Sequence, residues 1–126
     1  MPTSDYLRDE WTKYAFLTDA MGTRPDGWEV ALLTAADTEV AGGDDANYAR
    51  QAATFETFAQ TGRVRNDGAV SFPAAEAGAD YTVTHFAIYA ANTSEKLMEQ
   101  ELEFPKTITG GEVLTFGIGD LILGVN

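Results

Sequence analysis

The 126-residue sequence contains one histidine, His85, and no cysteine, and this limits the reactive chemistry that its side chains can perform. Without cysteine there is no thiol nucleophile, no disulfide and no cysteine-ligated zinc. His85 stands among alternating apolar residues, and no serine lies in the turn pattern of a hydrolase nucleophile. We therefore predict that His85 is a packed, hydrogen-bonded sheet residue and that the chain has no catalytic residues.

Carboxylates are the most abundant groups that could bind or catalyse. Asp and Glu number 20 against 8 Lys and Arg, which gives a formal net charge of −12. A carboxylate pair could hydrolyse a glycoside, but with so many acids no particular pair stands out. Asp37, Glu39, Asp44 and Asp45 fall in one expected loop and offer the oxygen ligands that calcium prefers. Their spacing matches no known calcium loop, so we interpret Asp37–Asp45 as a solvated acidic loop and predict no metal and no cofactor.

The negative charge also restricts the partners. Binding to nucleic acid or to anionic membranes depends on clustered Lys and Arg, so we expect neither partner. No apolar run approaches the roughly 20 residues of a membrane-spanning helix, and the first residues lack the features of a signal peptide. Two interpretations of the acidity stay open: solubility through self-repulsion, or adaptation to high salt, where ions screen the charges.

The elements that would position these residues begin with an N-terminal helix. Leu7, Trp11, Tyr14 and Ala15 recur at the spacing of an amphipathic helix, which we predict over residues 4–20. We expect residues 1–22 to belong to the same folding unit as the rest of the chain. The stripe of Leu7, Trp11 and Tyr14 is a candidate interface, and covering one end of the chain's own β-domain is an equally open interpretation.

After residue 22 the periodicity changes to the alternation that is typical of strands. The clearest strand runs from Tyr81 to Tyr89. There Tyr81, Val83, His85, Ala87 and Tyr89 are expected on one face, and Thr82, Thr84, Phe86 and Ile88 on the other. Further strands are predicted at residues 28–32, 48–55, 63–65, 69–72, 96–104, 112–116 and 121–125, with a hairpin turn at Gly110 and Gly111. The predicted fold is mainly β: an antiparallel β-sandwich or small barrel over residues 23–126, with an N-terminal amphipathic helix.

Several short motifs occur in an order and spacing that resemble a known family. They are Tyr48-Ala49-Arg50-Gln51 with Phe55, Val70-Ser71-Phe72-Pro73-Ala74, Val83-Thr84-His85-Phe86-Ala87-Ile88-Tyr89, Leu102, Pro105-Lys106-Thr107-Ile108, Gly111, Phe116 and Gly119-Asp120-Leu121. From about residue 28 to residue 124, the chain resembles small structural proteins of tailed viruses that are commonly labelled tail-fibre or virion proteins. The resemblance implies a location in the virion and a structural role.

We interpret most of the residues shared with that family as residues that stabilise the fold. The candidate core aromatics are Tyr48, Phe55, Phe72, Phe86 and Phe116. We expect Arg50 to brace a carboxylate or a loop carbonyl, and His85 to form a hydrogen bond within the sheet.

These observations favour a non-enzymatic virion protein. The chain lacks the repetitive shaft or the heptads that a fibre usually needs, so the favoured hypothesis is a capsid-decorating or cement protein on the head surface. Its expected partners are the major capsid protein and further copies of itself in a homo-oligomer. A tail-fibre or baseplate module is the alternative. From a different class, Trp28, Tyr81 and Tyr89 could form the aromatic platform of a secreted carbohydrate-binding module.

Overall fold

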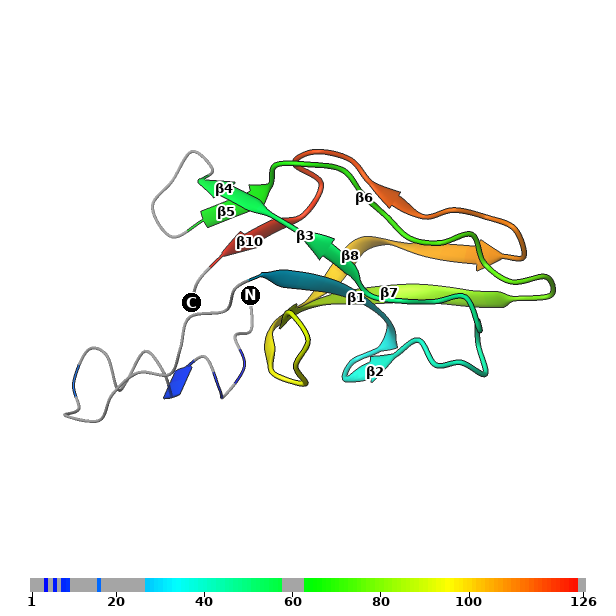
Figure 1. The fold of residues 1–126 in the computed structure, drawn as a ribbon, viewed down its shortest axis with the longest axis horizontal. Helices are drawn as coiled ribbons and strands as arrows, with labels where there is room; N and C mark the ends of the chain where they lie inside the picture. Colours follow the sequence, from blue (N-terminus) through cyan, green and yellow to red (C-terminus); the bar gives the residue numbers. More distant parts are fainter. Residues whose placement is uncertain are drawn as a thin grey trace.

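The computed structural model describes residues 4, 6, 8, 9, 16, 27–57 and 63–124. Within these residues the chain forms ten strands, and every strand pair is antiparallel (Figure 1). They are β1 (Trp28–Ala35), β2 (Thr38–Glu39), β3 (Gln51–Ala53), β4 (Phe55–Thr57), β5 (Arg63–Asn66), β6 (Val70–Ser71), β7 (Asp80–Ala90), β8 (Lys96–Thr109), β9 (Thr115–Phe116) and β10 (Ile122–Gly124). The prediction of a mainly β, antiparallel fold is confirmed.

Most of the predicted N-terminal helix, including its stripe of Leu7, Trp11 and Tyr14, lies outside the described residues. At Ser4, the backbone N–H donates to the carbonyl of Leu97 at 2.9 Å, and its own carbonyl accepts from the N–H of Arg8 at 3.1 Å. The second bond has the four-residue spacing of an α-helix. The first bond attaches the chain at Ser4 to the beginning of β8.

β1 lies near the centre of a five-stranded sheet. β7 and then β8 follow on one side of it, while β2 and β3 share its other edge. Between β2 and β3, two groups outside these strands form hydrogen bonds with the backbone of Leu32. Its N–H donates to the Tyr48 hydroxyl at 3.1 Å, and its carbonyl accepts from the N–H of Val40 at 2.9 Å. Both polar backbone groups of Leu32 are therefore hydrogen-bonded, although no strand pairs with this edge of β1 at that residue.

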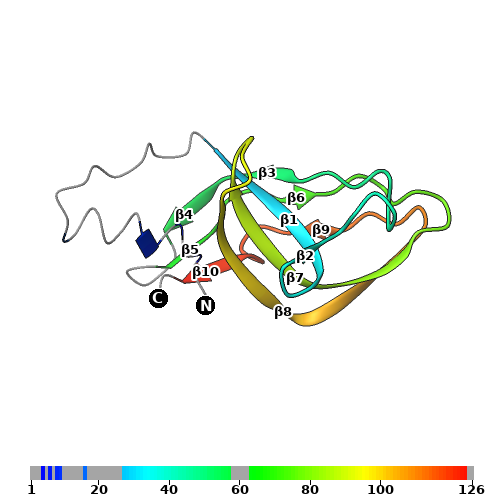
Figure 2. The ribbon, with the colours of Figure 1, turned by 90° about the horizontal axis from the view of Figure 1, so that it is seen from below.

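Two smaller sheets complete the core. β4, β5 and β10 form one of them, and β6 pairs with β9 in the other. Figure 2 shows the large sheet curving from β3 to β8 around β9 and β10. Buried apolar residues from all three sheets form one cluster, which we call the main core; it includes Val30, Leu32, Val70, Phe86, Phe116 and Leu123. Burial of this shared surface is the dominant force that holds the sheets together.

The predicted faces of β7 are wrong, because the alternation changes phase partway along the strand. Tyr81 and Val83 contribute to the main core, and so do Phe86 and Ile88, which the sequence placed on the opposite face. The change coincides with a shift of register against β8. Such a β-bulge bends a strand and changes which side chains face the core.

Other element bounds also differ from the predictions. The strand expected over residues 48–55 is interrupted, with β3 and β4 on either side of Thr54, so Tyr48 and Arg50 lie in the preceding loop. β2 was not predicted, and β8 continues past residue 104 to Thr109. The turn at Gly110 and Gly111 is confirmed, but it is not a hairpin turn, because β8 pairs with β7 and β9 pairs with β6. Gly111 has a φ of 85°, which favours glycine.

Candidate functional site

The large sheet has a second apolar cluster on the face that points away from the main core, which we call the outer face. Ala31, Leu33 and Ala87 are buried there, and Tyr89 packs against them. In the ladder, Ala31 pairs with Ala87, and Ala87 pairs with Glu99 of β8. Since directly paired residues share a face of the sheet, charged residues border this apolar cluster.

One ion-pair group on the outer face joins the β1–β2 turn to β8. The ammonium group of Lys96 bonds the Asp37 carboxylate and lies 3.0 Å from Oε1 of Glu99. The backbone N–H of Asp37 also donates to Glu99, at 3.1 Å and 3.3 Å to its two carboxylate oxygens. Partial burial would lower the pKa of Lys96, but its two carboxylate partners raise it overall, and Lys96 in turn lowers the pKa of Asp37. Lys96 and Asp37 are therefore both charged at neutral pH.

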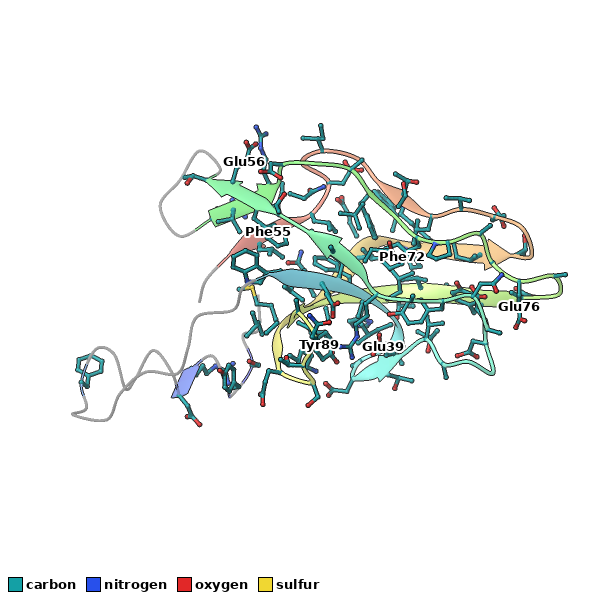
Figure 3. All side chains as sticks on the ribbon, viewed as in Figure 1. Glu39, Phe55, Glu56, Phe72, Glu76 and Tyr89 are labelled. Carbon is teal, nitrogen blue, oxygen red and sulfur yellow. The ribbon has the colours of Figure 1, made fainter. Side chains whose placement is uncertain are left out.

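Arg50 is the centre of a second group, and Figure 3 shows Glu39 and Tyr89 beside each other there. The guanidinium donates from Nε and Nη2 to the two oxygens of Glu39, at 3.0 Å and 2.9 Å. Its Nη1 donates to the carbonyl of Thr93 at 3.2 Å, and its Cζ lies over the ring of Tyr89, 3.7 Å from the ring centre. Arg50 thus ties β2 to both the end of β7 and the β7–β8 turn, through a bidentate ion pair and a cation–π contact.

Glu39 receives a further bond from the Tyr48 hydroxyl at 2.5 Å. Burial would raise the pKa of Glu39, but the bonds from Arg50 and Tyr48 outweigh it and lower the pKa overall. Burial and the neighbouring carboxylate raise the pKa of Tyr48, so its hydroxyl keeps its proton. Neither group is a free base or nucleophile, and the arrangement stabilises the sheet edge at Leu32.

Replacing Arg50 by lysine is expected to lower the free energy of unfolding by about 1–2 kcal/mol. Lysine keeps the charge, but it cannot donate the paired bonds to Glu39 or place a guanidinium over the ring of Tyr89. Urea unfolding of R50K and of the matched variant R63K, at the exposed Arg63, measures the difference. Equal stability of the two variants would contradict a tie at Arg50.

Asp45 is the centre of a third polar group, and it is buried with 2% of its surface exposed. One carboxylate oxygen accepts from the N–H groups of Asn47 at 2.9 Å and Glu76 at 3.1 Å. The other accepts from the Tyr81 hydroxyl at 3.0 Å. Burial would raise the pKa of Asp45, but these three donors lower it overall. The interpretation of Asp37–Asp45 as a solvated loop is therefore wrong at Asp45, which ties that loop to the segment before β7.

The four carboxylates that could have held calcium have different partners. Asp37 bonds Lys96, Glu39 bonds Arg50, Asp45 bonds Tyr81, and Asp44 accepts from the N–H of Ala41 at 3.1 Å. Among the residues that the structure describes, no three acidic or histidine side chains are grouped so that they could hold a metal ion.

Asn66, at the end of β5, is a buried tie that the sequence did not reveal. Its side chain is fully buried, donates to the carbonyls of Gly68 and Gly117 at 2.9 Å each, and accepts from the N–H of Leu121 at 2.9 Å. The glycines around Ile118 lie in a turn, in which the N–H of Asp120 donates to the carbonyl of Gly117 at 3.0 Å. Asn66 thus attaches β5 to the turn that leads into β10.

The candidate core aromatics surround the contact between the sheets. Phe72, Phe86 and Phe116 are buried, while Tyr48 and Phe55 are half-buried against the main core. Figure 3 labels Phe55 and Phe72 among these side chains. The ring of Phe72 stacks on Tyr48 with centres 6.2 Å apart, and Phe116 contacts both Phe72 and Phe86.

His85 lies on β7, half-buried, with Nδ1 at 2.8 Å from the Thr84 hydroxyl. In the ladder it pairs with Leu33 on one side and Glu101 on the other. The prediction that His85 forms a hydrogen bond within the sheet agrees with this contact, since Thr84 belongs to the same strand.

The three aromatics of the carbohydrate-binding alternative do not form one surface. Trp28 and Tyr81 pack against the main core, whereas Tyr89 lies on the outer face beneath Arg50. Trp28 makes an edge contact with Phe55 at 6.4 Å. A flat sugar-binding platform of these three rings is therefore absent from the described part of the chain.

Comparison with known proteins finds a matching family. The family model described as Podophage GP4 fiber I protein gp80 matches residues 2–124. No curated protein matches the sequence. None of the helices within the described residues is long and apolar enough to span a membrane.

Proposed function

Because the chain belongs to the podophage GP4 fiber I protein gp80 family and is thus a structural component of the virion, we propose that it is a non-enzymatic module of a tail fibre. Its partners are other virion proteins. The family description supports a fibre more than the head-surface decoration that the sequence favoured. The absence of a repetitive shaft does not oppose this assignment, since a compact module can occupy one position in a longer fibre assembled from several proteins.

The observation that carries the non-enzymatic role is the way in which the polar side chains are used. Arg50, Asp45, Asn66 and Lys96 each bond groups that are distant in the sequence. Among the described residues, no buried side-chain nitrogen or oxygen lacks a hydrogen-bond partner. A catalytic site needs a group that is poised to react with a substrate, whereas these groups are occupied in holding strands and turns together.

Antibody-gold labelling of purified particles tests the location. We expect gold on the tail or its fibres, with few copies of the protein per particle by quantitative mass spectrometry. Labelling of a major head protein on the same particles is the control. Gold spread over the head shell, with a copy number that scales with the capsid subunits, would overturn the fibre assignment in favour of decoration.

A further inference from the structure

β8, the longest strand within the described residues, carries a large bulge. Val83 of β7 pairs with Lys106 of β8, but His85, two residues later, pairs with Glu101. The segment 102–105 of β8 therefore lies opposite the single residue Thr84. Ordinary bulges add one residue to a strand, so this larger one displaces a short segment from the ladder.

The displaced segment exposes an aromatic ring. Leu102 packs against the main core, while Phe104 keeps 72% of its surface exposed. Leu102 thus anchors the base of the bulge and Phe104 stands out from it. Leaving a large apolar side chain in water forgoes the stabilisation that its burial would give, and aromatic residues are enriched among the side chains that dominate binding interfaces.

The bulge is poorly suited to pairing with another strand. β8 is the last strand of the large sheet within the described residues, so its outer edge is where an added strand would bind. Pro105 has no N–H to offer such a strand, and the displaced segment interrupts the regular spacing of donors and acceptors. A partner that uses this place must therefore recognise the side chain of Phe104 rather than the backbone.

The charges near Phe104 indicate the chemistry of the partner. Glu101 and Glu103 are exposed on the same strand, and they outnumber Lys106. The chain as a whole has a formal net charge of −12, so contact between two copies at this place would be opposed by repulsion. Lys or Arg side chains on the partner would instead be attracted to the glutamates.

We propose that Phe104 is a docking residue that inserts into an apolar pocket, rimmed by Lys and Arg side chains, on another protein of the virion. The proposal rests on the proposed function for its setting, since it takes the partner from among the virion proteins. Phe104 supplies the buried contact, and Glu101 and Glu103 orient it through the charged rim.

A phage that lacks the gene for this protein, complemented with variants of the full chain, provides the test. F104A is expected to lower the number of copies per purified particle at least about tenfold, which corresponds to the loss of one interface anchor. F104W should restore incorporation. I118A, at another side chain with 66% of its surface exposed, is the matched control and should be incorporated like the wild type.

Two further measurements separate the outcomes. Thermal unfolding of isolated F104A should match the wild type, since the ring is largely in water, and E101K/E103K should reduce incorporation with an intact fold.

Equal incorporation of F104A and wild type would overturn the proposal. A loss of self-association in isolated F104A, seen by sedimentation, would overturn it in favour of contact between two copies. Wild-type protein found on heads would reject the fibre assignment. The incorporation of F104A would still show whether Phe104 is needed for docking to the particle.

Discussion

Replacing Phe116 by alanine is expected to lower the free energy of unfolding by about 3–5 kcal/mol, the usual cost of removing a buried phenylalanine. Phe116 has only 3% of its surface exposed. Its ring centre lies 6.3 Å from that of Phe72 and 6.4 Å from that of Phe86. Because Phe86 belongs to the large sheet and Phe116 to the small β6–β9 sheet, the cavity would open at the contact that joins them.

Thermal and urea unfolding followed by circular dichroism measure this effect. The control is I118A, two residues further along the chain, where the side chain is exposed and the loss should be small. A fall in stability of this size is a large part of the roughly 5–15 kcal/mol that stabilises an ordinary domain. If F116A and I118A unfolded at the same urea concentration, the main core would not hold the two sheets together as described.

Replacing Asp45 by alanine is expected to cost about 2–4 kcal/mol, because three donors would lose their acceptor in a buried position. The donors are the N–H groups of Asn47 and Glu76 and the hydroxyl of Tyr81. D45N retains an acceptor oxygen and a similar shape, so it should lose less than D45A. The exposed neighbour Asp44 provides D44A as the control. Equal stability of D45A and D44A would contradict the role of Asp45 as a buried tie.

The same site predicts a dependence on pH. The folded protein holds the pKa of Asp45 below its ordinary value of 3.8, so the ionised carboxylate stabilises the fold at higher pH. This contribution is fully present above the unfolded-state pKa and is lost as the pH falls through the lower folded-state value. The stability difference between wild type and D45N, measured by urea unfolding, should therefore shrink as the pH falls from neutral to below 3.8. A constant difference would show that the charge of Asp45 does not stabilise the fold.

Local patterns in the sequence were sufficient to predict the strands with strong alternation. Residues 81–89 lie within β7 as expected, and the turn at Gly110 and Gly111 lies at its predicted place. Both features follow from neighbouring residues: a period of two in the first case, and the conformational freedom of glycine in the second. The mainly β fold follows from many such short segments taken together.

Features that depend on distant partners could not be predicted in the same way. The bulge opposite Thr84 depends on how β8 pairs with β7, so the local alternation of β7 gave the wrong face for Phe86. Tyr48 lies in a loop because its hydroxyl takes the place of a strand at Leu32, a residue 16 positions away. The acidity of the loop around Asp45 suggested exposure, whereas its donors from Glu76 and Tyr81 lie more than 30 positions further along the chain.

The candidate site residues also differ in whether local sequence patterns or distant partners determine their roles. The expectation that Arg50 would brace a carboxylate or a carbonyl came from its place among short motifs, and the structure gives it Glu39 and the carbonyl of Thr93. The buried role of Asn66 could be found only by knowing that residues 117–121 return beside it. Phe104 belonged to a predicted strand, and only the register of β8 shows that it lies in a bulge.

A cryo-electron microscopy reconstruction of the intact particle would test most directly where this β-fold lies in the virus and whether its strands keep their arrangement there. We expect density for residues 27–57 and 63–124 in a tail fibre, with the strands arranged as in the isolated chain and the Phe104 bulge seated on a neighbouring protein. Density for the same fold on the head shell, or sheets rearranged within the fibre, would contradict the claim that this fold is a non-enzymatic module of the tail fibre.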